Sequence, residues 1–209
     1  MRAKLWVLAG ITAWIVTLTL TTAASDDRRD DGRDNKGNDR DPRIEQGLDI
    51  APVPLHYDRK NRDAVGLGSY LVNAVGDCNG CHAGPSGAYA AGGDPAQGEP
   101  KVINQAAYLQ GGTPLFGPFF IPRNLTPDVT GRAEGGGSLQ EFFNIMRTGI
   151  DPDHAHPQFG PYLQVMPWPV FQNMSDTDLR AIYAYLSAIP CLEGDPGLPT
   201  PRPIGTRCK

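Results

Sequence analysis

Cysteine and histidine are scarce in this sequence, which has only four of each among its 209 residues. The sequence also lacks a large excess of either charge. Its 19 basic residues nearly balance its 23 acidic ones, and the formal net charge is −4. The sequence has no basic stripe of the kind that nucleic-acid-binding proteins need, so we exclude nucleic acid as a partner. It also has no βαβ pattern around its first two cysteines, which counts against a thioredoxin-like redox pair.

Glycine and proline, in contrast, are abundant. The 25 glycines and 20 prolines together occupy 45 positions that do not suit the interior of a helix or a strand. We therefore expect a loop-rich domain with a few short helices. The length of the chain and its hydrophobic content of 40% suit one modest domain with extensions.

The stretch from Asp77 to His82 contains Cys-x-x-Cys-His, the attachment sequence for c-type haem. On a helical turn, Cys78 and Cys81 lie on one side, where each thiol can add across one of the two haem vinyl groups. The next residue, His82, can then place an imidazole nitrogen on the iron. The motif predicts one covalently attached haem c, with His82 as the proximal iron ligand.

Three other interpretations of this motif stay open from the residues alone. A Cys-x-x-Cys pair also occurs in thioredoxin-like redox sites and as half of a zinc site. Zinc would need a second close pair of ligands, and the candidate is His154-Ala155-His156, whose spacing is unlike the usual one. Chance occurrence is the third interpretation, and the export signal described next counts against it.

Residues 1–24 have the pattern of an export signal peptide. Arg2 and Lys4 precede an apolar run over residues 5–20, and small residues complete the segment. The run is close to the ~17–25 residues of a minimal membrane-spanning helix, so an uncleaved membrane anchor is the alternative. Either way we expect the remaining chain in the periplasm, an oxidising compartment where disulfides persist.

Two cysteines remain once Cys78 and Cys81 are assigned to the haem. Cys191 and Cys208 make an even pair in an exported protein, so we expect a disulfide between them. This disulfide would tie down the proline-rich C-terminal tail over residues 191–209. Two free thiols are the alternative, which is less common in that compartment.

The segment after the export signal is rich in charge of both signs. Between Ser25 and Glu45 it has eight acidic and six basic residues and almost nothing apolar. Such a segment cannot bury enough surface to offset the entropy that it loses on ordering. We expect residues 25–60 to form a disordered charged tether, ahead of a folded domain over residues 61–190.

Three segments have the apolar spacing of helices. The first begins near Asp63 and continues to the haem motif, and its apolar positions are Ala64, Leu67, Leu71 and Ala74. The second covers residues 138–146, starts with a Ser-x-x-Glu capping box and has Gly149 just beyond its end. The third begins with a capping pattern at Ser175 and ends at Pro190.

The third predicted helix carries two tyrosines whose expected positions differ. Tyr183 lies on the apolar stripe, whereas Tyr185 lies off it. On the first helix, Gly66 and Tyr70 are one turn apart and form a close-contact face on which another helix can cross. We expect Tyr183 to meet this face.

Between the second and third helices stands Val165-Met166-Pro167-Trp168-Pro169, and with it the sequence resembles a class I c-type cytochrome. That family has, in this order, a first helix, Cys-x-x-Cys-His, a long wrapping segment, a methionine in a loop and an aromatic-rich last helix. Within the family the sequence is most similar to the haem-binding modules of bacterial membrane-associated dehydrogenases. The stretches that carry this similarity are residues 124–128, 147–149, 166–168 and 178–186.

The resemblance implies a small, loop-rich, all-α domain with three or more short helices around one covalently bound haem. It also implies that Met166 is the distal iron ligand, since a thioether suits haem iron and raises its reduction potential relative to a second histidine. Met174 is the rival ligand, and His154 or His156 is the third option. Met146 lies on the apolar stripe of its helix, so we expect it in the core.

Three further side chains are candidates for contact with the haem. Arg123 and Arg147 are candidate partners of the haem propionates, because a guanidinium can pair with a carboxylate in a bidentate manner. Surface arginines are the alternative. Trp168 is a candidate to pack on the haem edge or to donate its N–H to a propionate, and a buried core tryptophan is the alternative.

Together these features predict a single-haem cytochrome c in the periplasm that passes one electron at a time between redox protein partners. In this hypothesis the polypeptide makes and breaks no substrate bond, so the protein is a carrier rather than an enzyme by itself. One alternative is an electron-accepting cytochrome c subunit of a membrane-associated dehydrogenase complex. The other is a haem enzyme or gas sensor with an open or labile sixth ligand. Membrane association would come through residues 1–24.

Overall fold

The computed structural model describes residues 40–116, 120–151, 158–194 and 208. Within these residues, the first predicted helix forms where the apolar spacing places it. Helix α2 covers Arg62–Tyr70 and continues directly into the π-helical turn η1, Leu71–Val75. Ala74, which we expected on the apolar face, is exposed, because the wider turn of a π-helix shifts the register of the last residues.

The second and third predicted helices are α5, Leu139–Thr148, and α7, Asp176–Ala188. The capping box of α5 is complete, because Ser138 Oγ accepts from the amide of Glu141 and the Glu141 carboxylate accepts from the amide of Ser138. Gly149 ends this helix at a φ of 68°, a left-handed conformation that favours glycine. Helix α7 begins at a serine cap of the same kind. The predicted positions of both helices are confirmed.

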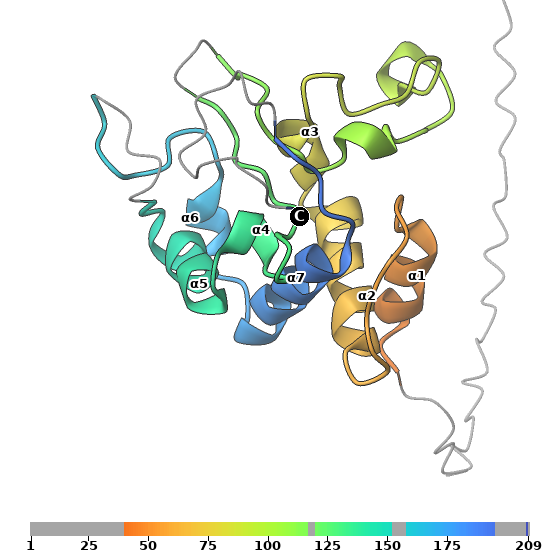
Figure 1. Ribbon diagram of the computed structural model, residues 1–209, viewed down its shortest axis with the longest axis horizontal. Coiled ribbons are helices and arrows are strands. Elements are labelled where there is room, and N and C mark those ends of the chain that lie inside the picture. Colours follow the sequence, from red (N-terminus) through yellow and green to blue (C-terminus); the bar gives the residue numbers. More distant parts are fainter. Residues whose placement is uncertain (1–39, 117–119, 152–157, 195–207, 209) are drawn as a thin grey trace, which may run out of the picture. The chain divides into compact units, whose positions relative to one another are not determined.

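Helices α2 and α7 cross at a glycine (Figure 1). A Cβ atom on Gly68 would lie 2.0 Å from the carbonyl oxygen of Ala181 and 2.7 Å from the Cβ of Tyr185. The two backbones reach this distance only because residue 68 has no side chain. Gly66 also lies at a close contact with another helix, as predicted, but that helix is α1, as described below.

The tyrosine buried at this crossing is Tyr185, and the prediction for Tyr183 is wrong. The hydroxyl groups of Tyr185 and Tyr108 are 2.8 Å apart, and Asn73 Nδ2 donates to the Tyr185 hydroxyl at 3.1 Å. Tyr183 is half-buried, and its hydroxyl donates to the carbonyl of Gly137 at 2.7 Å. Tyr185 can be buried off the predicted stripe because its hydroxyl finds partners from other segments, which helical periodicity does not reveal.

Residues 40–60 are folded, which corrects the prediction of a disordered tether over residues 25–60. They include helix α1, Pro42–Ile50, in which the Asp41 side chain accepts from the amide of the second helical residue. Ile44 is buried on the inner face of this helix. The number of charged residues did not reveal α1, because a short helix with one apolar contact face can keep its charged side chains in water. Residues 25–39 lie outside the described residues.

Helix α1 packs on α2 through a second close approach of two backbones. A Cβ atom on Gly47 would lie 1.9 Å from the carbonyl oxygen of Gly66. The segment after α1 contacts the end of α7, because the amide of His56 donates to the carbonyl of Ala188 at 2.8 Å. The folded domain therefore begins earlier than residue 61.

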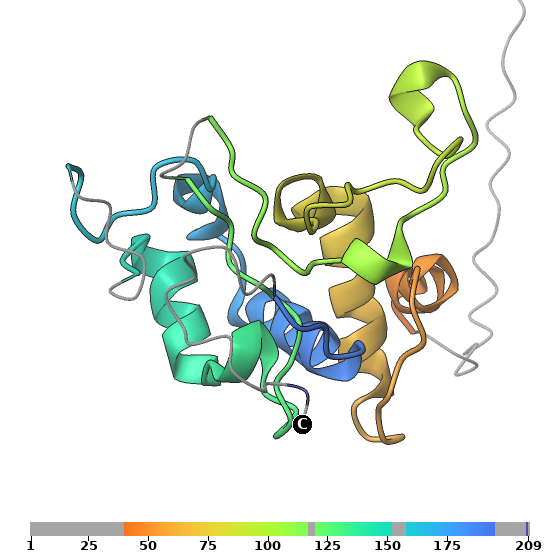
Figure 2. The same cartoon turned by 45° about the horizontal axis from the view of Figure 1, so that its top comes forward.

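The remaining described residues form loops with short helical turns. These turns are α3 (Cys78–His82), η2 (Pro95–Gln97), η3 (Gln105–Ala107), α4 (Ala133–Gly136) and α6 (Trp168–Phe171). Figures 1 and 2 show α5 and α6 on one side of α7 and the pair α1 and α2 on the other. Within the described ranges the chain has isolated bridges but no β-strand. The prediction of a loop-rich, all-α domain is confirmed for this part of the chain.

The start of the C-terminal tail is attached to the domain. The structure joins Cys191 to Cys208 by a disulfide, with their Cα atoms 5.5 Å apart. Asn124 Nδ2 donates to the carbonyl of Leu192 at 2.7 Å.

The predicted export signal, residues 1–24, lies outside the described residues. Among the helices of the described part, none has the length and apolar character needed to cross a membrane.

Candidate functional site

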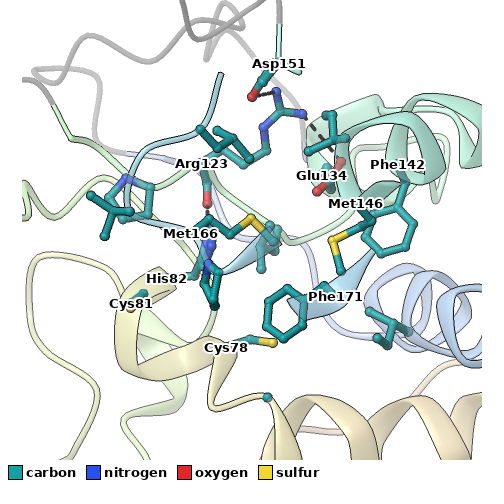
Figure 3. Close-up of a pocket in the computed structure, with 18 of the residues that line it drawn as sticks. Cys78, Cys81, His82, Arg123, Glu134, Phe142, Met146, Asp151, Met166 and Phe171 are labelled. Carbon is teal, nitrogen blue, oxygen red and sulfur yellow. Dashed lines mark hydrogen bonds and ion pairs between the residues drawn. The ribbon is translucent and has the colours of Figure 1, made fainter. Parts of the chain in front are cut away.

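A pocket of about 280 Å³ brings together residues that lie far apart in the sequence (Figure 3). Its wall includes Cys78, Cys81 and His82 from α3, and Met166 from the loop before α6. Apolar side chains from η1, α5, α6, α7 and the loops complete most of the wall. Those from helices and turns are Leu71, Phe142, Ile145, Met146, Phe171, Ile182 and Leu186. The four predicted haem-binding residues therefore share one largely apolar space.

A sharp turn of the chain presents α3 to this pocket. Asp77 has a φ of 45° and a ψ of 41°, so the chain reverses between η1 and the haem motif. The amide of Gly80 then donates to the carbonyl of Asp77 at 3.0 Å and closes the turn. Asn79, between the two cysteines, is buried and accepts from the amide of Leu109 at 3.0 Å. These contacts fix α3 from outside the pocket.

The environment of the two motif thiols disfavours their thiolate forms. Burial, with a smaller contribution from the Asp77 carboxylate, raises the pKa of Cys78 to about 12. Burial and Asp77 also raise the pKa of Cys81. A redox cysteine needs the opposite, an environment that stabilises the thiolate. The thioredoxin-like interpretation therefore loses support.

The described residues offer no metal-ligating cluster in support of the zinc interpretation. Among them, no group of three or more His, Cys, Asp and Glu side chains has the arrangement of a metal site. His154 and His156, the candidate second pair, lie outside the described residues. Their prediction as distal iron ligands is outside the described residues for the same reason.

The imidazole of His82 is oriented by a main-chain carbonyl. Its Nδ1 atom lies 2.8 Å from the carbonyl oxygen of Arg123. Since a carbonyl oxygen can only accept, the ring donates, and the lone pair of this tautomer is at Nε2. Histidines that bind metals commonly make this bond with the nitrogen that is not the ligand. His82 is thus prepared to bind a metal through Nε2.

Three thioether groups line the same pocket: those of Met146, Met166 and Met174. Figure 3 shows Met166 and Met146 reaching into the space next to His82. Met146 has only 4% of its surface exposed and belongs to the hydrophobic core, as its place on the apolar stripe of α5 predicts. Met166 and Met174 both stay candidates for the distal position, and the structure adds Met146 to them.

The loop that carries Met166 is fixed by Trp168. The indole Nε1 of Trp168 donates to the carbonyl of Leu163 at 3.1 Å, within the loop itself. A Cβ atom on Gly149 would lie 2.2 Å from the indole ring, so the ring packs directly on the backbone that ends α5. The proposed bond from Trp168 to a haem propionate is not supported, because the indole N–H already has a partner. Trp168 instead positions Met166.

The two candidate arginines lie in different places. Arg147 does not line the pocket, and its guanidinium bonds the carbonyl of Gln172 and, at 2.7 Å, the carboxylate of Asp176. Arg123 does line the pocket. Its Nη2 atom lies 2.6 Å from Asp151 Oδ2, and its Nη1 atom lies 3.5 Å from Glu134 Oε2.

Sequence reasoning missed Glu134 and Asp151 as residues of this pocket. They lie 11 and 28 residues from Arg123, with no motif that connects the three. The available signal was the glycine run over residues 135–137, which marks an unusual backbone. Glu134 at its start has a φ of 54°, a left-handed conformation that is uncommon for a residue other than glycine.

These residues fit a covalently attached haem. Cys78 and Cys81 supply two neutral thiols on one turn, and His82 supplies a nitrogen lone pair directed by its bond to Arg123. The thioethers supply the soft, neutral sulfur that is a known second ligand of c-type haem iron. The largely apolar wall suits the porphyrin. The donor set and the lining therefore agree with the motif.

Comparison with known proteins points in the same direction, although no protein-family profile matches the chain. Over 159 residues the chain is 30% identical to the gluconate 2-dehydrogenase cytochrome c subunit of Pantoea cypripedii, a match that covers 73% of this chain and 30% of that protein. Over 117 residues it is 36% identical to one of the subunits of nicotinate dehydrogenase from Pseudomonas putida, a match that covers 55% of this chain and 8% of that protein. The chain thus spans less than a third of the length of either relative. It is similar to part of two dehydrogenase subunits, one of which is named as a cytochrome c.

Proposed function

We propose that this protein binds one haem c and carries single electrons between redox proteins in the periplasm. Cys78 and Cys81 would form the thioether links, and His82 and Met166 would bind the iron. The observation that carries the proposal is that all four residues line one largely apolar pocket, although Met166 is far from the other three in sequence. The similarity to a cytochrome c subunit supports it.

The haem, when bound, would supply the one-electron redox chemistry. The residues of the chain control where that chemistry takes place and at what potential. Covalent links at Cys78 and Cys81 would keep the cofactor in place, and the Arg123 carbonyl would keep the His82 ring in one orientation. The apolar wall would exclude water. Two protein ligands would leave no open coordination position, which suits electron transfer rather than substrate chemistry.

The proposal is tested by expressing the full chain in a host that matures c-type cytochromes. The mature protein should exceed the mass of the apoprotein by one haem, and its colour should survive denaturing electrophoresis and acidic organic extraction. Cys78→Ser with Cys81→Ser should abolish both results. Haem that is extracted by acidic solvent, or bound zinc in place of haem, would contradict the proposal.

The comparisons favour a specific kind of electron donor, a dehydrogenase. Both relatives are dehydrogenase subunits, so we propose that this chain accepts electrons as part of, or next to, a dehydrogenase complex at the membrane. Purification of the tagged protein from its native host should retain a dehydrogenase whose substrate reduces the haem. A holoprotein that purifies alone and is reduced by no dehydrogenase fraction would leave the free carrier as the function.

A further inference from the structure

We propose that Glu134 and Asp151 position His82 through Arg123 and lower the reduction potential of the haem iron. This inference rests on the proposed haem c function. Arg123 makes the connection, because its carbonyl accepts from His82 Nδ1 and its guanidinium lies between the two carboxylates. Figure 3 shows this arrangement, with the two ends of Arg123 directed to opposite sides.

The main chain at Arg123 packs closely against Gly111, which also bonds to His82. A Cβ atom on Gly111 would lie 2.5 Å from the Arg123 carbonyl oxygen, and Gly111 also donates its amide to the carbonyl of His82 at 2.7 Å. On either side, the amide of Gly112 donates to Pro122 and the amide of Leu125 donates to Leu109, both at 2.9 Å. The ion pairs with Glu134 and Asp151 hold the side chain of the same residue, so both ends of Arg123 have defined partners.

The three charged side chains are taken out of water together. The side chain of Arg123 is 10% exposed, and those of Glu134 and Asp151 are 6% and 3% exposed. A buried guanidinium favours the ionised form of the carboxyl groups that pair with it, so each of these two carboxylates places negative charge beside the pocket. In a pocket of low polarity such a charge acts strongly on a nearby redox centre. It stabilises the ferric state relative to the ferrous state, which lowers the reduction potential.

The backbone at Glu134 supports a functional role for its carboxylate. Glu134 holds a left-handed conformation, with a φ of 54° and a ψ of 39°, although glycine would adopt it without strain. The amides of Glu134 and Gly135 donate to the carbonyls of Leu125 and Thr126 at 3.2 and 2.9 Å, and these bonds maintain the conformation. Strain of this kind is found mainly where a side chain must be held in a defined place.

The test uses the holoprotein and substitutions that preserve shape but remove charge. Asp151→Asn should shift the equilibrium constant for one-electron reduction at least tenfold toward the ferrous state, which is 59 mV for one electron. Glu134→Gln should shift it in the same direction, because it also removes a buried negative charge beside the pocket. The matched control is Asp176→Asn, which changes an exposed aspartate in the ion pair with Arg147. It should shift the constant less than twofold.

A second readout separates positioning from a general loss of stability. In the reduced, diamagnetic protein, the His82 Nδ1 proton should exchange with solvent faster in Asp151→Asn than in the wild type and in Asp176→Asn. If Asp151→Asn does not accumulate as holoprotein, Glu134→Gln decides the result by the same two measurements. Unchanged potential and exchange in variants that keep covalent haem would overturn this inference alone. Absence of covalent haem in the wild type would instead overturn the proposed function.

Discussion

At the scale of single residues, three thioethers line one pocket, and the choice among them would determine what a bound haem iron could do. Met166 lies in a loop that Trp168 and Gly149 fix in place, whereas Met146 belongs to a helix that packs in the core. A methionine on such a loop could bind the iron while the helices keep their positions, whereas Met146 is part of a packed helix. This favours Met166, and substitution can decide between the three.

Met166→Ala should remove the weak far-red band of methionine-bound ferric haem, lower the reduction potential and allow the ferrous protein to bind carbon monoxide, because a thioether favours the ferrous state and blocks the sixth position. Absorption spectroscopy and a redox titration measure these changes. Met174→Ala and Met146→Leu serve as controls and should change none of them. A wild-type protein that lacks the band and binds carbon monoxide readily would favour the haem enzyme or gas sensor.

The paired phenols of Tyr108 and Tyr185 give a prediction about alkaline pH. Burial raises the pKa of Tyr108 well above its usual value and, more weakly, that of Tyr185. A group whose pKa is higher in the folded state adds stability below its unfolded pKa of about 10, and that stability is lost as pH rises further. The free energy of unfolding should therefore decrease above about pH 10, and the decrease should be smaller in Tyr108→Phe. Denaturant titrations at several pH values measure it.

At the scale of elements, close contacts between backbones decide how the helices pack. Helix α1 meets α2 at Gly47, and α2 meets α7 at Gly68. In each contact, an added Cβ atom would lie 2.0 Å or less from a main-chain oxygen. Main-chain atoms cannot rotate away as the end of a side chain can. A methyl group at either glycine must therefore separate two helices.

Gly68→Ala should lower the free energy of unfolding by about 1–3 kcal/mol, because overpacking outweighs the helical preference of alanine. Denaturant unfolding of the holoprotein measures this change. Gly80→Ala is the matched control within another helix, since its nearest contact is the Asp77 carboxylate, which can rotate away. Its effect should be much smaller. Equal losses in the two variants would show that the close contact at Gly68 is not responsible.

At the scale of the whole molecule, the C-terminal tail is held to the haem-motif side of the fold. The disulfide between Cys191 and Cys208 spans 17 residues, and the carbonyl of Leu192 accepts from Asn124. The side-chain amide of Gln110 also donates to the carbonyl of Glu193 at 2.6 Å. These contacts join the chain after α7 to the two loops that surround Arg123.

Cys191→Ser with Cys208→Ser should lower the free energy of unfolding by about 3 kcal/mol in the chain-entropy account, while the haem stays covalently attached. The two loops next to the tail should then exchange their amide protons faster. Thiol labelling of the unfolded, unreduced holoprotein provides an independent check. Modification of two cysteines in that experiment would show that the disulfide does not form.

The sequence alone was sufficient for features that depend on near neighbours. The capping residues of α5 and α7 and the apolar spacing of α2 lie within a few positions of one another, so local chemistry determines those helices. The haem motif is equally local, which is why Cys78, Cys81 and His82 are recognised without a structure. The predicted disordered tether extended too far along the chain, because charge composition reports average solvation and not the one face on which α1 packs.

Tertiary structure decided every feature that needs residues from distant segments. Gly66 lies at the contact with α1 and Gly68 at the contact with α7, and no periodicity within α2 shows which helix approaches which glycine. The cluster of Arg123, Glu134 and Asp151 forms because two loops and the short turn α4 meet at one wall of the pocket. The sequence by itself determined which groups can hold a haem, because covalent chemistry depends on residue type and spacing. Only the fold decided which groups surround that site, because packing brings together charges that the chain order keeps apart.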